Sequence, residues 1–216
     1  MAFGGLVGKA AGLDMKGCWF DGTMTQTYVG KDTAQFGGLI GTGADKDNDG
    51  ATIATCLFTG KMTLNFKCTN ATQGTWGGRI GGFAGWDGTK SMTIKNSISA
   101  GEIKVNWLNN GSTKPNSVIR TNPTIGWIQN ASTTTNGNVY YVPNSVSIYI
   151  EHKDTTTVST EVYKTDKTIT FNTVSIAKDA LLGADGGTLT KLTFGENGWT
   201  KRDGKVPVPT ALKDVK

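Results

Sequence analysis

The stretch Phe36-Gly37-Gly38-Leu39-Ile40-Gly41 decides the fold of this chain, because close copies of it recur. The clearest copies are Phe3–Gly8 and Ile80–Gly85, and a degenerate fourth copy is readable at Thr124–Gln129, without one glycine of the pair and without the closing glycine. A unit of a few dozen residues cannot bury its apolar face alone, so it must stack on copies of itself. The repetition therefore predicts a solenoid, with insertions placed in loops.

A second phrase follows each glycine-rich one. It reads apolar, two residues, Cys or Ser, two or three residues, Gly, polar, apolar, and it occurs at Met15–Met24, Ile53–Met62 and Ile94–Ile103, with an echo at Val139–Val142. Short alternating stretches bounded by glycine are typical of strands with one buried face. The glycine pair permits a sharp bend or a close approach of a neighbouring coil, which predicts a solenoid corner. A plain hairpin turn is the alternative.

The second phrase puts Cys18, Cys56 and Ser97 at one equivalent position. Stacked coils present equivalent residues one above the other, so we expect a ladder of small side chains in the core, with packed and unreactive thiols. With Cys68 the chain has 3 cysteines, an odd number, so at least one thiol has no partner within the chain. One disulfide is the alternative. None of the spacings is the C-x₂-C type of zinc sites.

These phrases resemble the GLUG repeat of bacterial secreted and surface proteins. That family includes adhesin-like proteins of gut bacteria and non-catalytic repeat regions of some IgA-cleaving metallopeptidases. The resemblance implies a right-handed parallel β-helix, or a closely related solenoid, over residues 1–145. Gly198–Thr200 and Asp203–Pro207 resemble the piece that closes the solenoid in that family.

Residues 146–216 are predicted to form irregular strands, a short helix and a C-terminal capping segment. Ser145–Ile150 and Thr168–Phe171 alternate like the strands of an inserted hairpin. Ser175 is a candidate N-cap and Gly183 a candidate C′ residue, which predicts one short helix between them. We expect this helix to lean on the C-terminal end of the solenoid, and the overall fold class to be all-β.

Composition excludes several classes of partner. The chain has 22 Lys and Arg against 17 Asp and Glu, and the basic residues are scattered and form no nucleic-acid motif. No apolar run is long enough to span a membrane.

The first repeat begins without a secretory leader, so we expect a piece of a longer secreted protein, located outside the cell or at its surface. An open first coil would favour self-association.

The chain has 6 tryptophans, and exposed aromatic rings stack on sugars. Trp127 takes an apolar position of its glycine phrase and Trp199 belongs to the closing piece, so both are expected in the core. Trp76, Trp86 and Trp107 lie in or beside loops rich in glycine and asparagine, and they are the candidates for a ligand-binding face. For each of them a core position is the alternative.

Asp45, Asp47 and Asp49 precede Gly50 at alternate positions of one tight loop. Hard oxygen ligands around a glycine turn suit calcium, so these carboxylates are a candidate calcium site. An EF-hand-type loop would also need a glutamate where the chain has Cys56. A solvated acidic loop is the alternative, and no other cofactor is expected.

No catalytic motif is present, the single histidine is His152, and Glu102 is the lone acid of the mid-repeat strands. With the resemblance, the sequence favours a non-catalytic extracellular module, adhesin-like or a stalk, that displays loops to host glycans or to host or bacterial surface proteins. Parallel β-helices also include polysaccharide lyases and hydrolases, so a carbohydrate-active β-helix with paired carboxylates is the alternative. An accessory repeat of a larger protease is a third hypothesis.

Overall fold

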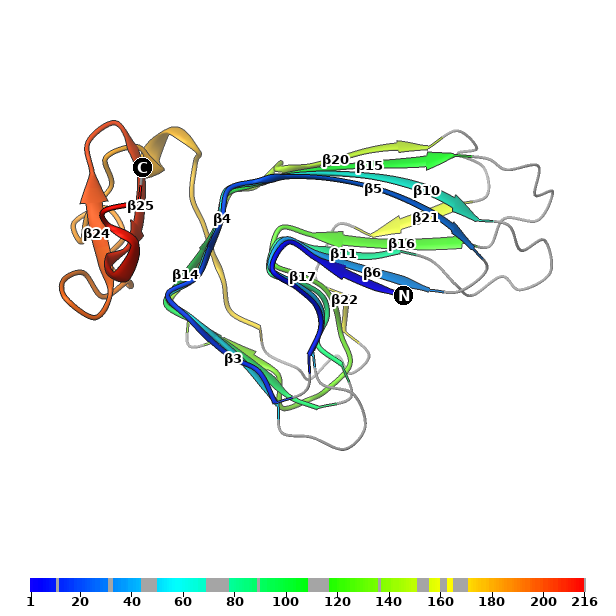
Figure 1. Ribbon diagram of the computed structural model, residues 1–216, viewed down its shortest axis with the longest axis horizontal. Coiled ribbons are helices and arrows are strands. Elements are labelled where there is room, and N and C mark those ends of the chain that lie inside the picture. Colours follow the sequence, from blue (N-terminus) through cyan, green and yellow to red (C-terminus); the bar gives the residue numbers. More distant parts are fainter. Residues whose placement is uncertain are drawn as a thin grey trace.

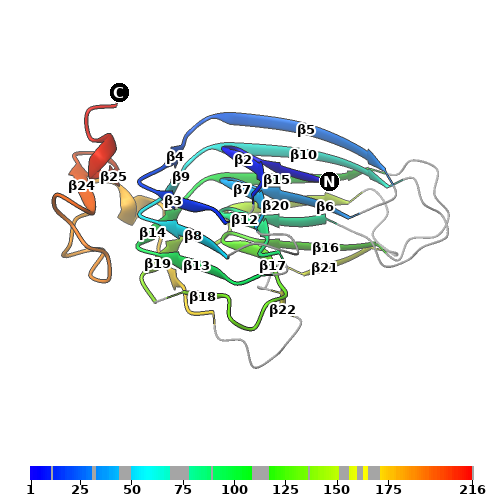
Figure 2. The ribbon, with the colours of Figure 1, turned by 60° about the horizontal axis from the view of Figure 1, so that its bottom comes forward.

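Each of the first four repeats folds into five short strands, and the strands of successive repeats pair in parallel (Figure 1). The computed structural model describes residues 1–10, 12–30, 33–43, 50–68, 78–88, 90–108, 117–135, 137–150, 156–159, 163–164 and 171–215. Within these ranges the chain is a parallel β-solenoid without an α-helix, so the predicted all-β solenoid is confirmed. Figure 2 shows the coils stacked along one axis.

Five sheets, named A to E in the order in which the chain visits them, run along this axis. Sheet A contains β1 (Ala2–Gly4), β6 (Ala34–Gly37), β11 (Gly78–Gly81), β16 (Ser117–Asn122) and β21 (Thr156–Ser159). Sheet B contains β2 (Val7–Lys9), β7 (Ile40–Thr42), β12 (Ala84–Trp86), β17 (Ile125–Ile128) and β22 (Tyr163–Lys164). Sheet C contains β3 (Asp14–Lys16), β8 (Ala51–Ala54), β13 (Met92–Lys95) and β18 (Thr134–Thr135).

Sheets D and E complete each coil. Sheet D contains β4 (Trp19–Phe20), β9 (Leu57–Phe58), β14 (Ser97–Ser99), β19 (Val139–Tyr141) and β23 (Val174–Ser175). Sheet E contains β5 (Thr23–Gly30), β10 (Lys61–Cys68), β15 (Glu102–Leu108) and β20 (Val146–Ile150). Sheet E lies over sheet A, and the chain bends back from sheet A into sheet B before it returns through sheets C and D (Figure 1).

The strand register confirms the alignment of the second phrase between repeats. It corrects the position of the fourth copy of the glycine-rich phrase. Met62 lies opposite both Met24 and Ile103, as the aligned phrases require. Gly81 lies opposite Asn122, however, so the fourth glycine-rich copy begins at Thr121 and not at Thr124.

The fourth copy therefore keeps the closing glycine, Gly126, and replaces the glycine pair with Asn122 and Pro123. The side chain of Asn122 takes over part of the turn, because its Oδ1 accepts a hydrogen bond from the backbone N–H of Thr124 at 2.8 Å. This substitution hid the repeat in the sequence.

The glycines allow sheets A and B to approach closely, which confirms the solenoid corner. A Cβ on Gly38 would lie 2.2 Å from the carbonyl oxygen of Gly82 in the next coil. A Cβ on Gly85 would lie 2.5 Å from the backbone nitrogen of Phe36 in the coil before. No side chain fits at such distances, so the bend requires glycine at these positions.

Ladders of equivalent side chains fill the interior. Cys56 is fully buried, and its backbone N–H donates to Ser97 Oγ at 3.1 Å. Cys18 and Cys56 are both free thiols, and burial raises the pKa of Cys56 to about 12, so it stays protonated at neutral pH. Rings stack in the same way, with centroids 4.3 Å apart for Phe66 and Trp107. The predicted ladder is confirmed in register, with Cys56 fully buried and Cys18 half-buried in the first coil.

The solenoid extends past the boundary expected at residue 145. Strand β20 pairs in parallel with β15, and β21, β22 and β23 add a further coil that reaches Ser175. The hairpin expected at Ser145–Ile150 is therefore wrong, because this stretch is the sheet E strand of the fourth coil. Its second strand, expected at 168–171, lies largely outside the described residues.

The C-terminal segment, residues 176–215, lies on the outer face of sheet D and not across the end of the column (Figures 1 and 2). We call it the lateral clamp. It contains η2 (Asp179–Leu181), β24 (Trp199–Arg202), β25 (Lys205–Pro209) and η3 (Thr210–Leu212). The expected Ser175–Gly183 helix is only the single 3₁₀ turn η2.

The clamp has its own apolar core with the outward side chains of sheet D. These are Leu57, Ile98 and Tyr140 from the solenoid, and Leu181, Leu189, Trp199 and Val208 from the clamp. Both faces of sheet D are thus buried, as is usual for parallel sheets. No helix in the described ranges is long and apolar enough to cross a membrane.

Candidate ligand-binding site

Three tryptophans were predicted to bind ligand. Among the described residues, Trp86 is the one of these three that lies at the surface. Trp76 and the candidate calcium ligands Asp45, Asp47 and Asp49 lie outside the described residues. Trp107 is 5% exposed and stacks on Phe66 in the core, so its ring is not available to a sugar. No group of three His, Cys, Asp or Glu side chains that could hold a metal ion is found within the described ranges.

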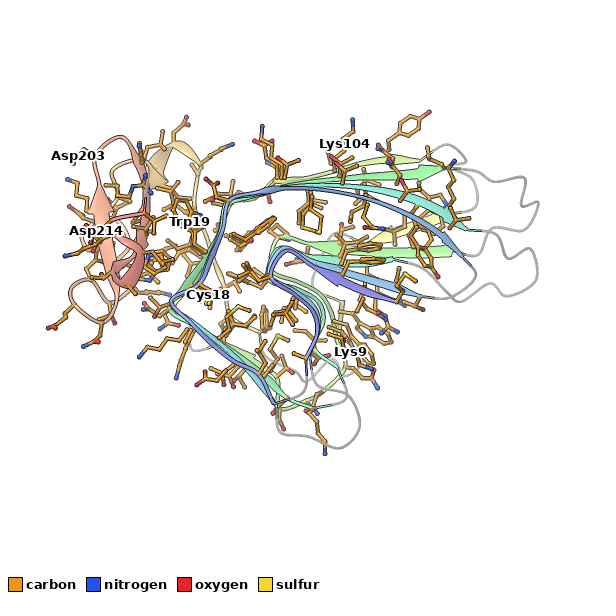
Figure 3. All side chains as sticks on the ribbon, in the orientation of Figure 1. Lys9, Cys18, Trp19, Lys104, Asp203 and Asp214 are labelled. Carbon is orange, nitrogen blue, oxygen red and sulfur yellow. The ribbon has the colours of Figure 1, made fainter. Side chains whose placement is uncertain are left out.

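Trp86 lies in a cleft between the outward sides of sheets A and B, which we call the A/B cleft. A cavity of about 260 Å³ occupies the cleft at the level of the first three coils. It is lined by Met1, Ala2, Lys9, Gln35, Thr42 and Trp86. Figure 3 shows Lys9 pointing outward from sheet B, on the side of the molecule opposite to Lys104 of sheet E.

Two rows of side chains in strand register include the polar and aromatic residues that line this cavity, and they continue past it along the axis. In sheet A, Gln35, Arg79 and Arg120 occupy equivalent positions of consecutive coils. In sheet B, Lys9, Thr42, Trp86 and Trp127 do the same. Because neighbouring strands in a sheet are about 4.8 Å apart, each row repeats at that interval along the axis.

Arg79 joins the two rows. Its guanidinium carbon lies 3.2 Å from the ring centroid of Trp127 and 4.6 Å from that of Trp86. The two indole rings are themselves stacked, with centroids 5.9 Å apart and an interplanar angle of 21°. Cation–π contacts of this kind hold the aromatic rings in place. Trp127 was expected in the core and is half-buried on this outer face instead.

Three buried polar atoms of the cleft have no hydrogen-bond partner in the described protein. They are Nε of Arg79, Nε1 of Trp86 and Oγ1 of Thr42. Arg79 is 8% exposed and Thr42 is 4% exposed, so neither group is simply solvated. Buried polar groups are normally hydrogen-bonded, and a cluster of exceptions points to a site that a polar ligand can satisfy.

Asp87 follows Trp86 and is fully buried. Its carboxylate accepts hydrogen bonds from the backbone N–H of Gln129 at 2.9 Å, the backbone N–H of Asn130 at 3.0 Å and Thr133 Oγ1 at 2.7 Å. Burial nevertheless raises the pKa of Asp87 to about 6, since desolvation outweighs these hydrogen bonds. Asp87 therefore anchors the turn that follows Trp127.

Glu102, the lone acid noted in the sequence, lies elsewhere. It is exposed on sheet E beside a cavity of about 680 Å³ between the solenoid and the clamp. Its carboxylate is 2.8 Å from Nζ of Lys178 and 3.7 Å from Nζ of Lys61, and these lysines lower its pKa. No second carboxylate among the residues lining this cavity pairs with it.

The sequence did carry a signal for the arginines of the cleft. Gln35 and Arg79 each stand directly before a glycine-rich phrase, and Thr42 and Trp86 each stand directly after its closing glycine. Positions that flank a solenoid corner on both sides come together outside it. For Arg120 and Trp127 the same signal was obscured by the misplaced fourth copy.

Comparison with known proteins adds no relative. No family model, no curated protein and no solved structure matches this chain. The resemblance to GLUG repeats accordingly stays a prediction, as does the handedness that it implies.

Proposed function

We propose that this chain is a non-catalytic, extracellular surface module, adhesin-like, that binds glycan along the A/B cleft. The observation that carries the proposal is the stacked pair Trp86 and Trp127, half-buried on an outer face beside unpartnered polar atoms. Aromatic faces stack on sugar rings, and nearby donors and acceptors bind the hydroxyl groups. The solenoid provides a rigid stalk that fixes the spacing of these groups.

Rigidity supports this role. The cleft residues lie on paired strands and not on loops, so their positions are set by backbone hydrogen bonds in the neighbouring coils. Binding groups that are already in place lose little conformational entropy when a ligand binds. A repeated row also offers several equivalent contacts to a repeating polymer.

The competing hypothesis is a carbohydrate-active β-helix, which would need a carboxyl group free to transfer a proton. Asp87 is the described acid next to Trp86, and both of its oxygens accept hydrogen bonds from the following coil. Glu102 is paired with lysines on another surface. These contacts favour the binding module over the enzyme.

The test is a glycan array probed with the wild-type chain and with Trp86→Ala, in calcium and again in chelator. We expect specific binding that Trp86→Ala weakens by at least about tenfold, a loss of about 1.4 kcal/mol. The matched control is Tyr149→Ala, which removes an aromatic ring that is 57% exposed on sheet E. Loss of binding in chelator would show that a metal ion is required, for which Asp45, Asp47 and Asp49 are the candidate ligands.

Three results would contradict the proposal. Absence of binding to every glycan would leave only the stalk, or a protein partner. An equal effect of Trp86→Ala and Tyr149→Ala would move the site away from the A/B cleft. Cleavage of a bound polysaccharide by the wild-type chain would establish the enzyme.

A further inference from the structure

We propose that the ligand of the A/B cleft is an acidic glycan, whose carboxylate or sulfate group pairs with Arg79 while a sugar ring stacks on Trp86. The inference rests on the proposed function and narrows it to a class of ligand. The walls of the cleft carry it, because the charged side chains that the described strands place there are Lys9, Arg79 and Arg120.

Arg79 is a largely buried cation beside the two indole rings. It is 8% exposed, its Nε has no hydrogen-bond partner among the described residues, and its guanidinium lies against the Trp86 and Trp127 rings. A buried charged group is costly unless it is paired. An aromatic face stabilises the cation only in part, so the guanidinium would gain strongly from an anion placed beside Trp86, the ring that Arg79 shares with the cavity.

The surroundings of Arg79 increase that gain. Arg120 occupies the equivalent position one coil further, and its guanidinium carbon lies 5.0 Å from the Trp127 ring centroid. Burial and the neighbouring charge of Arg120 lower the pKa of Arg79 to about 9. The acid that acts on Arg79 is Asp87, whose carboxylate already accepts three hydrogen bonds from the next coil.

The geometry of the rows fits an extended ligand. The guanidinium of Arg79 lies against Trp86 of its own coil and Trp127 of the next, and the guanidinium of Arg120 lies near the Trp127 ring of its own coil. The pair of a cation and an aromatic ring thus recurs at the coil spacing of about 4.8 Å, a regular interval that suits a polymer of repeating units. Arginine also offers a planar fork of donors that matches a carboxylate or a sulfate.

The first experiment needs no variant. Binding of the wild-type chain to polygalacturonate is measured by calorimetry, and galacturonate and galactose, which differ at the C6 carboxylate, are compared as competitors. We expect galacturonate to compete at a concentration at least about tenfold lower than galactose. Added salt should weaken the binding, because it screens the attraction between the exposed Lys9 and the polyanion. Equal competition by the two sugars would overturn the proposal.

The second experiment compares two variants that each remove one positive charge. Arg79→Gln should lower the affinity for polygalacturonate at least about tenfold, while Lys104→Gln, on the exposed side of sheet E, should leave it unchanged. Equal losses in the two variants would show general attraction of a polyanion and overturn the assignment of Arg79. Thermal melts confirm that each variant is folded.

Further glycans distinguish carboxylate from sulfate as the anionic group. They also distinguish the proposed glycan binding from the narrower proposal of an acidic ligand. Hyaluronan presents carboxylates alone, and dextran sulfate presents sulfates alone, so their relative affinities identify the anionic group. Binding of neutral glycans with the same affinity, still dependent on Trp86, would keep the proposed function and overturn the acidic ligand. No binding to any glycan in the series would overturn both.

Discussion

Asp87 shows how a single residue connects two coils. Its carboxylate is buried in the third coil, and the three groups that donate to it belong to residues 129–133 of the fourth. Because Trp86 precedes it and Trp127 precedes the turn that it holds, Asp87 positions both rings of the cleft. Its ionisation is therefore coupled to the shape of the site.

We predict that the stability contributed by Asp87 depends on pH. The pKa of Asp87 is raised from 3.8 to about 6 in the folded chain, so between these values the folded state binds a proton that the unfolded state has lost. The free energy of unfolding therefore falls as pH rises through this window. In Asp87→Asn this dependence disappears, so the destabilisation caused by the variant should shrink as pH rises.

Urea unfolding of wild type and Asp87→Asn at about pH 4.5 and about pH 7 measures this difference. The variant should remain less stable at both values by about 1–3 kcal/mol, because the asparagine amide cannot accept both backbone N–H groups. A difference between the two proteins that stays constant with pH would show that Asp87 does not titrate in this range.

In β7, β12 and β17 of sheet B, the glycine that follows the buried Ile40, Ala84 or Ile125 determines how closely sheets A and B approach each other. Gly41, Gly85 and Gly126 are equivalent in register, and each approaches the backbone of sheet A in the preceding coil. Gly8 has the same place in the first coil, but a Cβ there would meet nothing closer than the carbonyl oxygen of Ala2 at 3.2 Å.

This difference gives a prediction with an internal control. Gly85→Ala should destabilise the chain by several kcal/mol, since its Cβ would lie 2.5 Å from the nitrogen of Phe36 and 2.6 Å from the carbonyl oxygen of Arg79. Gly8→Ala should cost about 1 kcal/mol or less. Chemical denaturation of both variants tests this, and similar losses would mean that the corner tolerates a side chain.

The sequence predicts the strands best where their positions follow from the spacing of the repeated phrases. The alignment of Met24, Met62 and Ile103 could be derived from spacing alone, because stacked coils put equivalent residues in register. Even the burial of Trp107 was readable, since Ile103, Val105 and Trp107 alternate as inward residues of one strand. The glycine- and asparagine-rich loop beside Trp107 obscured that pattern.

Two features depended on contacts between distant parts of the chain, and the sequence did not reveal them. The position of the C-terminal segment is set by packing of Trp199 against sheet D, which no spacing records. The cleft arises because Arg79 and Trp86 flank one corner and meet outside it. The segment around Ala180 and Leu181 has a helical pattern, yet it is too short to continue beyond one 3₁₀ turn.

At the scale of the whole molecule, the lateral clamp connects coils that are far apart along the axis. Arg202 lies over the Trp19 ring of the first coil at 5.5 Å, and Tyr140 Oη of the fourth coil accepts a hydrogen bond from the backbone N–H of Lys191 at 3.3 Å. Nearest-neighbour stacking alone would let terminal coils fray independently. We therefore expect the clamp to make their unfolding cooperative.

Trp199→Ala tests this role. The ring is 1% exposed and its Nε1 donates to the carbonyl oxygen of Asn96 at 3.0 Å, so the variant should lose about 3–5 kcal/mol. Leu182→Ala, at a side chain of the clamp that is 50% exposed, should change stability by less than about 1 kcal/mol. In a denaturant titration, unchanged stability and cooperativity in Trp199→Ala would show that the coils hold together without the clamp.

The clamp also determines how the molecule would carry tension. Ala211 lies beside Gly17, and Arg202 lies over Trp19, so the last part of the chain is fastened at the level of the first coil. A pull applied to the two ends then passes from the first coil straight into the clamp. The coils that carry Trp86 and Trp127 remain outside the load path until the clamp detaches, so we expect this pair of rings to keep its arrangement while the molecule is under strain.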